Sequence, residues 1–256
     1  MFDYIFITHL PSFYKTNLYN ELSKKLKICV IFVGKGSDIR TSDFTAGKIN
    51  FDYHFLSEAS FENRSVIKSL FKLYFLLKKI KYNMIAVGGW ELPEFWLTIL
   101  TSHKKNNALV LESSIEESVH KGLKGFIKKL FLNRLSTVFA SGSSQKQLLD
   151  QLNYKGSTFI TKGVGIINKN TDLKKSSDFN NNFLYVGRLS EEKNLPTLIQ
   201  VFNNIPEYKL TIVGSGHLEG KLKKLAKPNI NFISHVKNDE MYKVYLENDV
   251  LVLPSI

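Results

Sequence analysis

The sequence is poor in cysteine, in acidic residues and in long hydrophobic runs. Its one cysteine, Cys29, excludes an internal disulfide and lies in the apolar run ICVIFV, so we expect a reducing compartment. Lys72 interrupts the most apolar later stretch, Ser69–Leu77, which is far shorter than the roughly 20 residues that a membrane span needs. Asp3 and an apolar run that ends at His9 are unlike an export signal. We therefore expect a cytoplasmic protein, or one bound peripherally to the inner face of a membrane.

The shortage of acidic residues leaves the chain strongly basic. The chain has 35 Lys and Arg and 23 Asp and Glu, so its formal net charge is +12. This positive charge favours an acidic partner. We find no paired Cys/His metal spacing, no aromatic RNA-binding signature and no basic arm leading into heptads, so no nucleic acid is expected. A phosphorylated small molecule and an anionic membrane surface remain as partners. The alternative is that most lysines only solvate the surface.

Short apolar runs alternate with amphipathic segments along the first part of the chain. The expected strands are Tyr4–Thr8, Ile28–Val33, Phe51–Leu56, Met84–Val87, Ala108–Leu111, Thr137–Ala140 and Thr158–Thr161. The apolar stripes that predict helices are Leu18/Leu22/Leu26, Val66/Leu70/Tyr74/Leu77 and Leu123/Phe126/Ile127/Leu130/Phe131. Alternating strands and helices imply parallel strands with right-handed crossovers, hence an open α/β sheet covered on both faces.

A polar stretch, NKNTDLKKSSDFNNN, separates this part from a second one with the same alternation. The strands expected after it are Phe183–Val186, Lys209–Val213, Ile230–Ile233 and Val250–Leu253, and the helices are Leu195–Asn204, Leu218–Ala226 and Asp239–Glu247. We therefore predict an α/β chain of two Rossmann-like domains, residues 1–167 and 183–256, joined by a linker over 168–182.

The first strand of the second domain is followed by GRLSEEKN, a segment suited to a diphosphate. Arg188 offers a planar fork of donors for two phosphate oxygens, and Lys193 adds a mobile point charge. Asn194 as N-cap and Pro196 in the first turn predict a helix whose free N–H groups point at the same place. A capped helix with surface Arg and Lys is the alternative.

The next strand ends in VGSGHLEG. Gly214 and Gly216 allow a sharp turn and a close approach to a ligand. Their spacing misses the dinucleotide fingerprint, so a nicotinamide dehydrogenase is disfavoured. The sequence also lacks an Asp-x-Asp metal signature, and Arg188 with Lys193 would do the electrostatic work of a metal, so no metal is expected.

The segments FLYVGRLSEEKNLPTLIQVF, LTIVGSGHLEGKL and NINFISHVKNDEMYKVYLENDVLVLPS, in this order, resemble the donor-binding domain of the GT4-type (glycosyl transferases group 1) retaining glycosyltransferases. Earlier segments, THLPSFYKTNLYNEL, AVGGWELPEFW and LVLESSIEES, resemble more loosely the acceptor domain of bacterial polysaccharide or lipopolysaccharide members. The resemblance implies the GT-B architecture, in which two Rossmann-like parallel-sheet domains face a cleft.

The resemblance also implies roles for individual residues. Arg188 and Lys193 would stabilise the charge that develops on the leaving nucleotide, as catalytic groups. The other residues expected to bind the nucleotide sugar are Gly187, Gly214, Ser215, Gly216 and Val236. The residues expected to bind the acceptor are Ser12, Tyr14, Asn17, Trp90 and Glu91. Glu112 would orient or deprotonate an acceptor hydroxyl, with an ordinary strand-end glutamate as the alternative.

The implied function is retaining transfer of a sugar from a nucleotide-sugar donor to a glycan or lipid-linked acceptor, in the biosynthesis of a cell-surface polysaccharide such as lipopolysaccharide or capsule. No cofactor is expected. The helix within 121–134 would rest on anionic lipid, or else bury its apolar stripe in the core.

The family normally continues beyond LVLPS into a segment with two glutamates. We therefore expect an incomplete second domain, from a truncated gene product or one that a second chain completes. Two further alternatives are a non-catalytic remnant or partner subunit that binds acceptor or membrane, and a sugar-nucleotide epimerase of the same fold.

Overall fold

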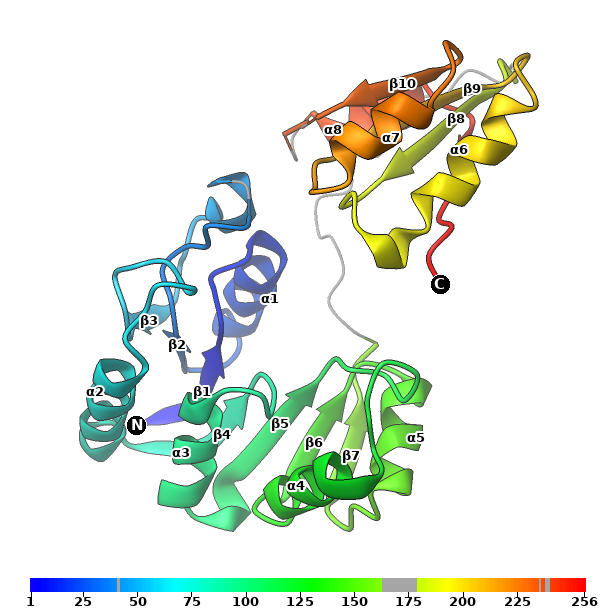
Figure 1. The fold of residues 1–256 in the computed structure, drawn as a ribbon. Helices are drawn as coiled ribbons and strands as arrows, with labels where there is room; N and C mark the ends of the chain where they lie inside the picture. Colours follow the sequence, from blue (N-terminus) through cyan, green and yellow to red (C-terminus); the bar gives the residue numbers. More distant parts are fainter. Residues whose placement is uncertain (41, 163–178, 235, 238–239) are drawn as a thin grey trace. The chain divides into compact units, whose positions relative to one another are not determined.

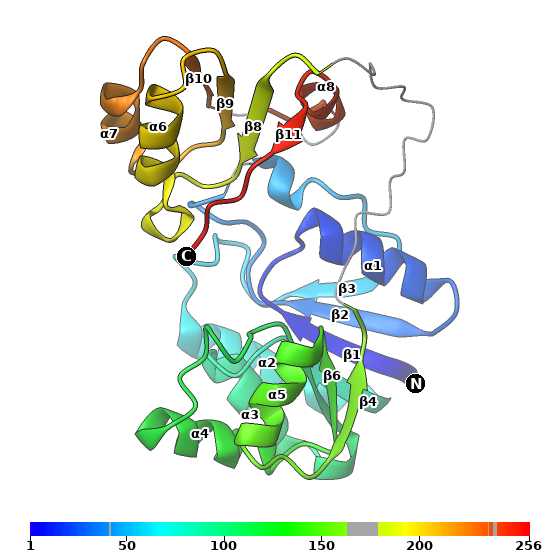
Figure 2. The ribbon, with the colours of Figure 1, turned by 90° about the vertical axis from the view of Figure 1, so that its right-hand side faces the viewer.

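The computed structural model of the protein describes residues 1–40, 42–162, 179–234, 236–237 and 240–256. The chain divides into two compact units, Met1–Asn168 and Lys169–Ile256 (Figures 1 and 2). Most of the predicted linker, residues 168–182, lies outside the described residues, so its extent stays a prediction.

Unit 1 is built on a parallel sheet of seven strands within the described residues. They are β1 (Phe2–Thr8), β2 (Ile28–Phe32), β3 (Asp52–Phe55), β4 (Tyr82–Val87), β5 (Asn107–Leu111), β6 (Thr137–Ala140) and β7 (Ser157–Ile160). Their order is β3-β2-β1-β4-β5-β6-β7, and every neighbouring pair is parallel. Each strand expected from the sequence is present, with ends that differ by no more than two residues. The prediction of a parallel α/β sheet is confirmed.

Helices cover both faces of this sheet. They are α1 (Phe13–Ser23), α2 (Val66–Lys79), α3 (Pro93–Thr101), α4 (Gly122–Leu132) and α5 (Ser143–Gln151), with short 3₁₀ segments η1 (Ser42–Thr45) and η2 (Lys104–Asn106). Residues from α2, α3, α4 and α5, among them Leu73, Phe95, Phe131 and Leu148, share one core cluster on one face. Tyr19 of α1 belongs to the cluster on the other face. This division follows from right-handed crossovers, because the chain moves one way from β1 to β3 and the other way from β3 to β7.

Unit 2 repeats the arrangement on a smaller scale. Its strands β8 (Asn182–Val186), β9 (Lys209–Val213), β10 (Ile230–Ile233) and β11 (Val250–Leu251) are parallel in the order β10-β9-β8-β11. The connecting elements are η3 (Glu191–Lys193), α6 (Leu195–Asn203), α7 (Glu219–Leu225) and α8 (Met241–Leu246). The core cluster includes Tyr185, Ile199, Phe202, Ile212 and Leu222.

Cys29 lies in the middle of β2 and is fully buried. Burial, with a smaller contribution from the charge of Asp52, raises the pKa of its thiol to about 12. Because the thiolate is the reactive form, we expect no reaction of the native protein with a thiol-specific disulfide reagent at pH 8. Denaturation in guanidinium should release one equivalent of chromophore, as expected for a single cysteine. Rapid labelling of the native protein would contradict this burial.

Candidate functional site

In unit 2, the loops that follow β8 and β9 are held against each other. The backbone N–H of Leu189 donates to the carbonyl oxygen of Ser215 at 3.0 Å. Gly214 has a φ of +143°, and a Cβ there would collide with the carbonyl oxygen of Gly187. A Cβ at Gly216 would collide with the carbonyl oxygen of Leu189. The glycines therefore let the two loops pack together, which brings residues 187–190 beside 214–217.

Arg188, which is exposed, and Lys193, which is half-buried, place positive charge on the segment that follows β8. The Arg188 side chain is 59% exposed, and its Nη2 lies 3.2 Å from Oε1 of Glu192. The buried hydroxyl of Tyr185 donates to the Arg188 carbonyl oxygen at 2.9 Å and fixes the backbone beneath the guanidinium. Lys193 Nζ lies 3.4 Å from the Ser255 hydroxyl. The exposed ion pair between Arg188 and Glu192 contributes less than about 1 kcal/mol to stability. A phosphate can therefore replace Glu192 as the partner of Arg188.

His217 is a third basic side chain at the same loops. Its Nε2 lies 2.8 Å from Oε2 of Glu191. The pKa of the Glu191 carboxyl lies below its usual value, because the hydrogen bond from His217 stabilises the carboxylate. The loops thus combine three basic side chains with two glutamates, Glu191 and Glu192, that balance part of their charge.

Helix α6 begins beside these loops, where the sequence predicts it, and Asn194 occupies the N-cap position as expected, but without a side-chain capping hydrogen bond. Asn194 adopts a left-handed conformation, with φ 50° and ψ 34°, and its side chain caps no helix N–H. Its Oδ1 accepts a hydrogen bond from the Thr197 hydroxyl at 2.8 Å instead. Pro196 lies in the first turn as expected. The first N–H groups of α6 are therefore free of a cap from Asn194.

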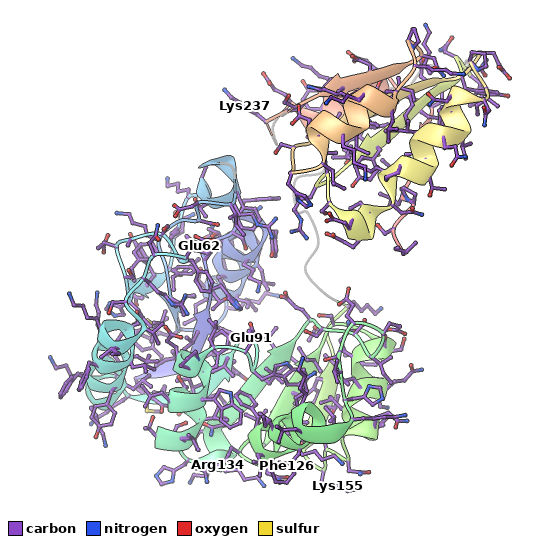
Figure 3. The ribbon with its side chains drawn as sticks, in the orientation of Figure 1. Glu62, Glu91, Phe126, Arg134, Lys155 and Lys237 are labelled. Atoms are coloured by element: carbon purple, nitrogen blue, oxygen red, sulfur yellow. The ribbon has the colours of Figure 1, made fainter. Side chains whose placement is uncertain are left out.

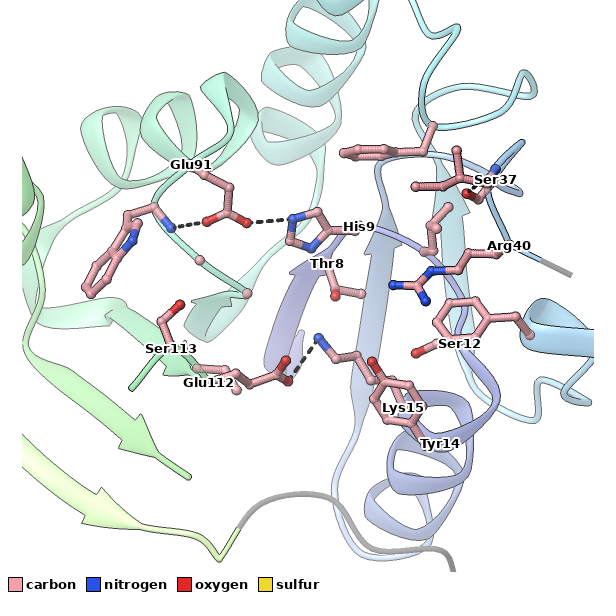
Figure 4. A pocket seen from close by; sticks show the side chains of 18 of the residues that line it. Thr8, His9, Ser12, Tyr14, Lys15, Ser37, Arg40, Glu91, Glu112 and Ser113 are labelled. Carbon is pink, nitrogen blue, oxygen red and sulfur yellow. Dashed lines mark hydrogen bonds and ion pairs between the residues drawn. The ribbon is translucent and has the colours of Figure 1, made fainter. Parts of the chain in front are cut away.

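In unit 1, a pocket opens at the carboxyl ends of the neighbouring strands β1, β4 and β5. Its volume is about 440 Å³. Glu91 lies at this edge of the sheet (Figure 3), and Figure 4 shows the pocket from close by. The predicted acceptor and catalytic residues that line it are Ser12, Tyr14, Trp90, Glu91 and Glu112. These residues, whose roles were implied by the family resemblance, therefore lie together at the carboxyl ends of the strands, where open parallel sheets bind ligands.

Two ion pairs lie in the wall of this pocket (Figure 4). Lys15 Nζ is 3.0 Å from Oε1 of Glu112, and only 11% of the Lys15 side chain is exposed. His9 Nε2 is 2.6 Å from Oε1 of Glu91, and the His9 ring packs edge-on against Phe95. Burial alone would raise the pKa of Glu91, but the hydrogen bond and charge of His9 outweigh it, so this pKa lies below its usual value. Glu91 is therefore ionised at neutral pH.

The same wall contains two buried hydroxyl groups without a hydrogen-bond partner among the described residues. They are Oγ1 of Thr8 and Oγ of Ser12, whose residues are 1% and 2% exposed. An unpaired buried polar group costs about 1–3 kcal/mol, so such groups usually have a ligand or water as partner. Arg40 also lines the pocket, with its guanidinium 5.0 Å from the centre of the Phe44 ring. The pocket thus offers hydroxyl, carboxylate and guanidinium groups to a polar ligand.

The sequence did not indicate Thr8, Lys15 or Arg40. Thr8 ends β1, so the strand-end rule applied residue by residue would have found it, whereas Lys15 lies inside the first turn of α1 and does not follow a strand directly. Arg40 lies in the irregular segment between β2 and β3, where no periodicity points to it.

One predicted residue does not line the pocket, and nothing tests another. Asn17 lies one turn further along α1 and does not line the pocket. Val236 follows His235, which lies outside the described residues. Their roles in acceptor and nucleobase binding stay predictions.

Comparisons with known proteins match one family over unit 2 and one fold over the whole chain. Residues 169–256 match the sequence model of the family Glycosyl transferases group 1. Sulfoquinovosyl transferase SQD2 of Arabidopsis thaliana is 34% identical over 74 residues, which are 28% of this chain and only 14% of that protein.

Solved structures extend the likeness to the whole chain. A glycosyltransferase from Rickettsia africae has a TM-score of 0.66 at 14% identity, covering 99% of this chain and 73% of that one. Anabaena Alr3699/HepE, in complex with UDP and glucose, has a TM-score of 0.64 at 13% identity, covering 100% and 74%. The chain therefore has the α/β fold of the GT-B glycosyltransferases, and residues 169–256 carry the sequence pattern of Glycosyl transferases group 1.

Proposed function

We propose that the protein is a retaining glycosyltransferase that moves a sugar from a nucleotide-sugar donor to a glycan or lipid-linked acceptor of a cell-surface polysaccharide. The observation that carries the proposal is the loop pair of unit 2, where the backbone around exposed Arg188 packs against the loop Gly214–Gly216 and half-buried Lys193 follows in η3. These residues lie within the segment that matches the family. The UDP and glucose in the Anabaena relative support a nucleotide-linked donor.

In this proposal the unit 2 loops bind the donor diphosphate. Cleavage of the bond between sugar and phosphate leaves growing negative charge on the nucleotide, and cations already in place stabilise that charge. Arg188 exchanges its single contact with Glu192 for phosphate oxygens, to which a guanidinium can donate two parallel charge-assisted bonds. We propose that neither a metal nor another cofactor takes part, since Arg188 and Lys193 supply the positive charge.

The unit 1 pocket binds the acceptor in the same proposal. The unpaired hydroxyls of Thr8 and Ser12 meet the hydroxyl groups of a sugar, and the Trp90 ring offers an apolar face. Lys15 fixes the direction of the Glu112 carboxylate, which orients the attacking hydroxyl or accepts its proton. A polyhydroxylated acceptor satisfies more of these groups than an apolar one would.

We expect Arg188→Ala to lower the rate of sugar transfer by on the order of 100-fold or more, because it removes a charge contact that strengthens in the transition state. Transfer is measured by mass spectrometry as the gain of one sugar on a glycan array, with UDP-, ADP- and GDP-sugars as donors. Lys223→Ala is the matched control, since Lys223 is an exposed basic residue of α7 that pairs with Glu219 and lies over the Phe232 ring. It should leave transfer unchanged.

Three results would contradict the proposal. If Arg188→Ala transferred sugar at the parent's rate, the guanidinium would not take part in the reaction. Release of free nucleotide without any glycosylated product would favour an epimerase. Nucleotide binding without transfer from any donor would favour a non-catalytic binding module.

A further inference from the structure

The outer side of α4 is apolar and open to solvent. Four large apolar side chains of this helix are between 42% and 74% exposed: Leu123, Phe126, Ile127 and Leu130. Their spacing of three and four residues places them on one side of the helix. Phe131 and Leu132 are the large side chains by which α4 is buried in the core. Of the stripe predicted from the sequence, Phe131 is buried in the core, whereas the other four side chains are exposed, so burial of the whole stripe is wrong.

Helix α2 has the same construction. Four of its large apolar side chains are between 37% and 68% exposed: Ile67, Phe71, Tyr74 and Phe75. Ser69 and Leu73, on the opposite side of the helix, are the residues buried against the sheet. The sequence period of α2 had indicated one apolar stripe for the core, whereas the helix has a second one that faces outward.

The two outward stripes belong to one surface of unit 1. α2, α3 and α4 cover the same face of the sheet and contribute to the same core cluster. Trp96 of α3 packs edge-on against Phe131 of α4, at 4.9 Å between ring centres, and Leu100 of α3 is 56% exposed. Phe126 points away from the sheet (Figure 3). Exposed apolar side chains gathered on one surface in this way mark a binding surface more often than a solvated one.

Charge on this surface has one sign. Neither α2 nor α4 contains an acidic residue, and the one acidic residue of α3, Glu94, is fully buried. The lysines beside the apolar stripes are Lys68, Lys72, Lys78 and Lys79 on α2, Lys104 and Lys105 in η2, and Lys121, Lys124, Lys128 and Lys129 at α4. A second copy of the chain docked here by two-fold symmetry would set lysines against lysines, and nucleic acid would leave the apolar side chains unpaired.

We propose that the outer faces of α2, α3 and α4 form a docking surface for an anionic lipid bilayer. Helices with an apolar stripe flanked by lysines lie in the plane of a membrane interface, with the apolar side chains about 5–10 Å into the boundary between headgroups and acyl chains. The lysines then face anionic headgroups. No described segment of the chain forms a helix long and apolar enough to cross a membrane. This docking surface is independent of the proposed transferase chemistry.

The test is co-sedimentation of the purified chain with lipid vesicles. We expect binding to vesicles of 30% phosphatidylglycerol in phosphatidylcholine, little binding to phosphatidylcholine alone, and weaker binding as salt is raised from 0.1 to 0.5 M. Three double variants should each lower the partition coefficient by about tenfold or more: Phe126→Ser/Leu130→Ser, Phe71→Ser/Phe75→Ser and Lys124→Gln/Lys129→Gln.

Matched controls come from unit 2. Val201 and Leu225 are 50% and 45% exposed, and Lys221 and Lys224 are exposed lysines of α7. Val201→Ser/Leu225→Ser and Lys221→Gln/Lys224→Gln should bind vesicles as the parent does, and every variant should keep the parent's thermal unfolding midpoint. Equal binding to neutral vesicles, no binding to either kind, or equal losses in the controls would overturn the proposal. A dimer in solution that Phe126→Ser/Leu130→Ser dissociates would assign the surface to a second copy instead.

Discussion

Replacing Arg64 with methionine is expected to destabilise unit 1 by about 3–5 kcal/mol, because it leaves a buried carboxylate without its partner. Arg64 Nε lies 3.0 Å from Oε1 of Glu94, and the two side chains are 9% and 0% exposed. The Arg64 Nη1 also donates to the Phe61 carbonyl oxygen at 2.7 Å, and the guanidinium lies 4.1 Å from the Phe61 ring centre. Guanidinium denaturation followed by circular dichroism measures the loss.

Two further variants control this prediction. Lys72→Met, on the exposed side of α2, makes the same kind of change without burial and should stay within about 0.5 kcal/mol of the parent. Arg64→Met/Glu94→Leu removes both charges and should recover much of the lost stability. A loss under about 1 kcal/mol for Arg64→Met, or a double variant no more stable than the single one, would contradict the account.

The ion pair between Arg64 and Glu94 also supports the wall of the unit 1 pocket. Phe61, held by Arg64, packs against the His9 ring at 5.5 Å between ring centres. His9 in turn orients Glu91 in the pocket wall. Arg64 is therefore a positioning residue, which acts on the Glu91 carboxylate through Phe61 and His9.

Replacing Gly214 with alanine is expected to destabilise unit 2 by about 2–6 kcal/mol, from roughly 1–3 kcal/mol of overpacking and a similar amount of backbone strain. The methyl group would meet the carbonyl oxygen of Gly187, and the φ of +143° is one that an L side chain rarely adopts. Because that oxygen belongs to the backbone, the two loops must move apart. Nucleotide binding should therefore fall together with stability.

Gly220→Ala is the matched control for Gly214→Ala. Gly220 lies in α7, and a Cβ there meets no atom within 4 Å. Alanine should raise stability at this position by about 0.5–1 kcal/mol, because it is the better helix former. Chemical denaturation of both variants makes the comparison, and equal effects at the two glycines would contradict the close packing of the loops.

The alternation of apolar runs and amphipathic stripes was sufficient to predict the parallel sheets. It did not predict two of the helices, α3 and α5. The segment PEFWLTILT of α3 is apolar almost throughout and therefore shows no helical period. Helix α5, SSQKQLLDQ, has only two large apolar side chains, Leu148 and Leu149, with which to form a stripe. The spacing of apolar residues predicts a helix only where that helix has both a buried and a solvated side.

The candidate sites were predictable where side chains follow a strand directly. Arg188 was found in this way, whereas Glu91 and Glu112 were carried over from the family resemblance. Partners that arrive from elsewhere in the chain were not predicted, because Lys15 reaches Glu112 across 97 positions and Arg64 reaches Glu94 across 30. Which cation faces which carboxylate depends on strand order, which the sequence alone does not define.

Titration of the full chain with UDP, ADP and GDP, followed by the backbone amide signals in NMR, tests the proposed donor site most directly. We predict that at least one nucleotide shifts the amides of residues 187–194 and 214–217 at sub-millimolar concentration, and that Lys193→Ala weakens this binding by about tenfold or more, as expected for loss of a charge-assisted phosphate contact. If no nucleotide shifts these amides, or if the shifts are confined to the unit 1 pocket, the loops of unit 2 are not a nucleotide site and the central claim is wrong.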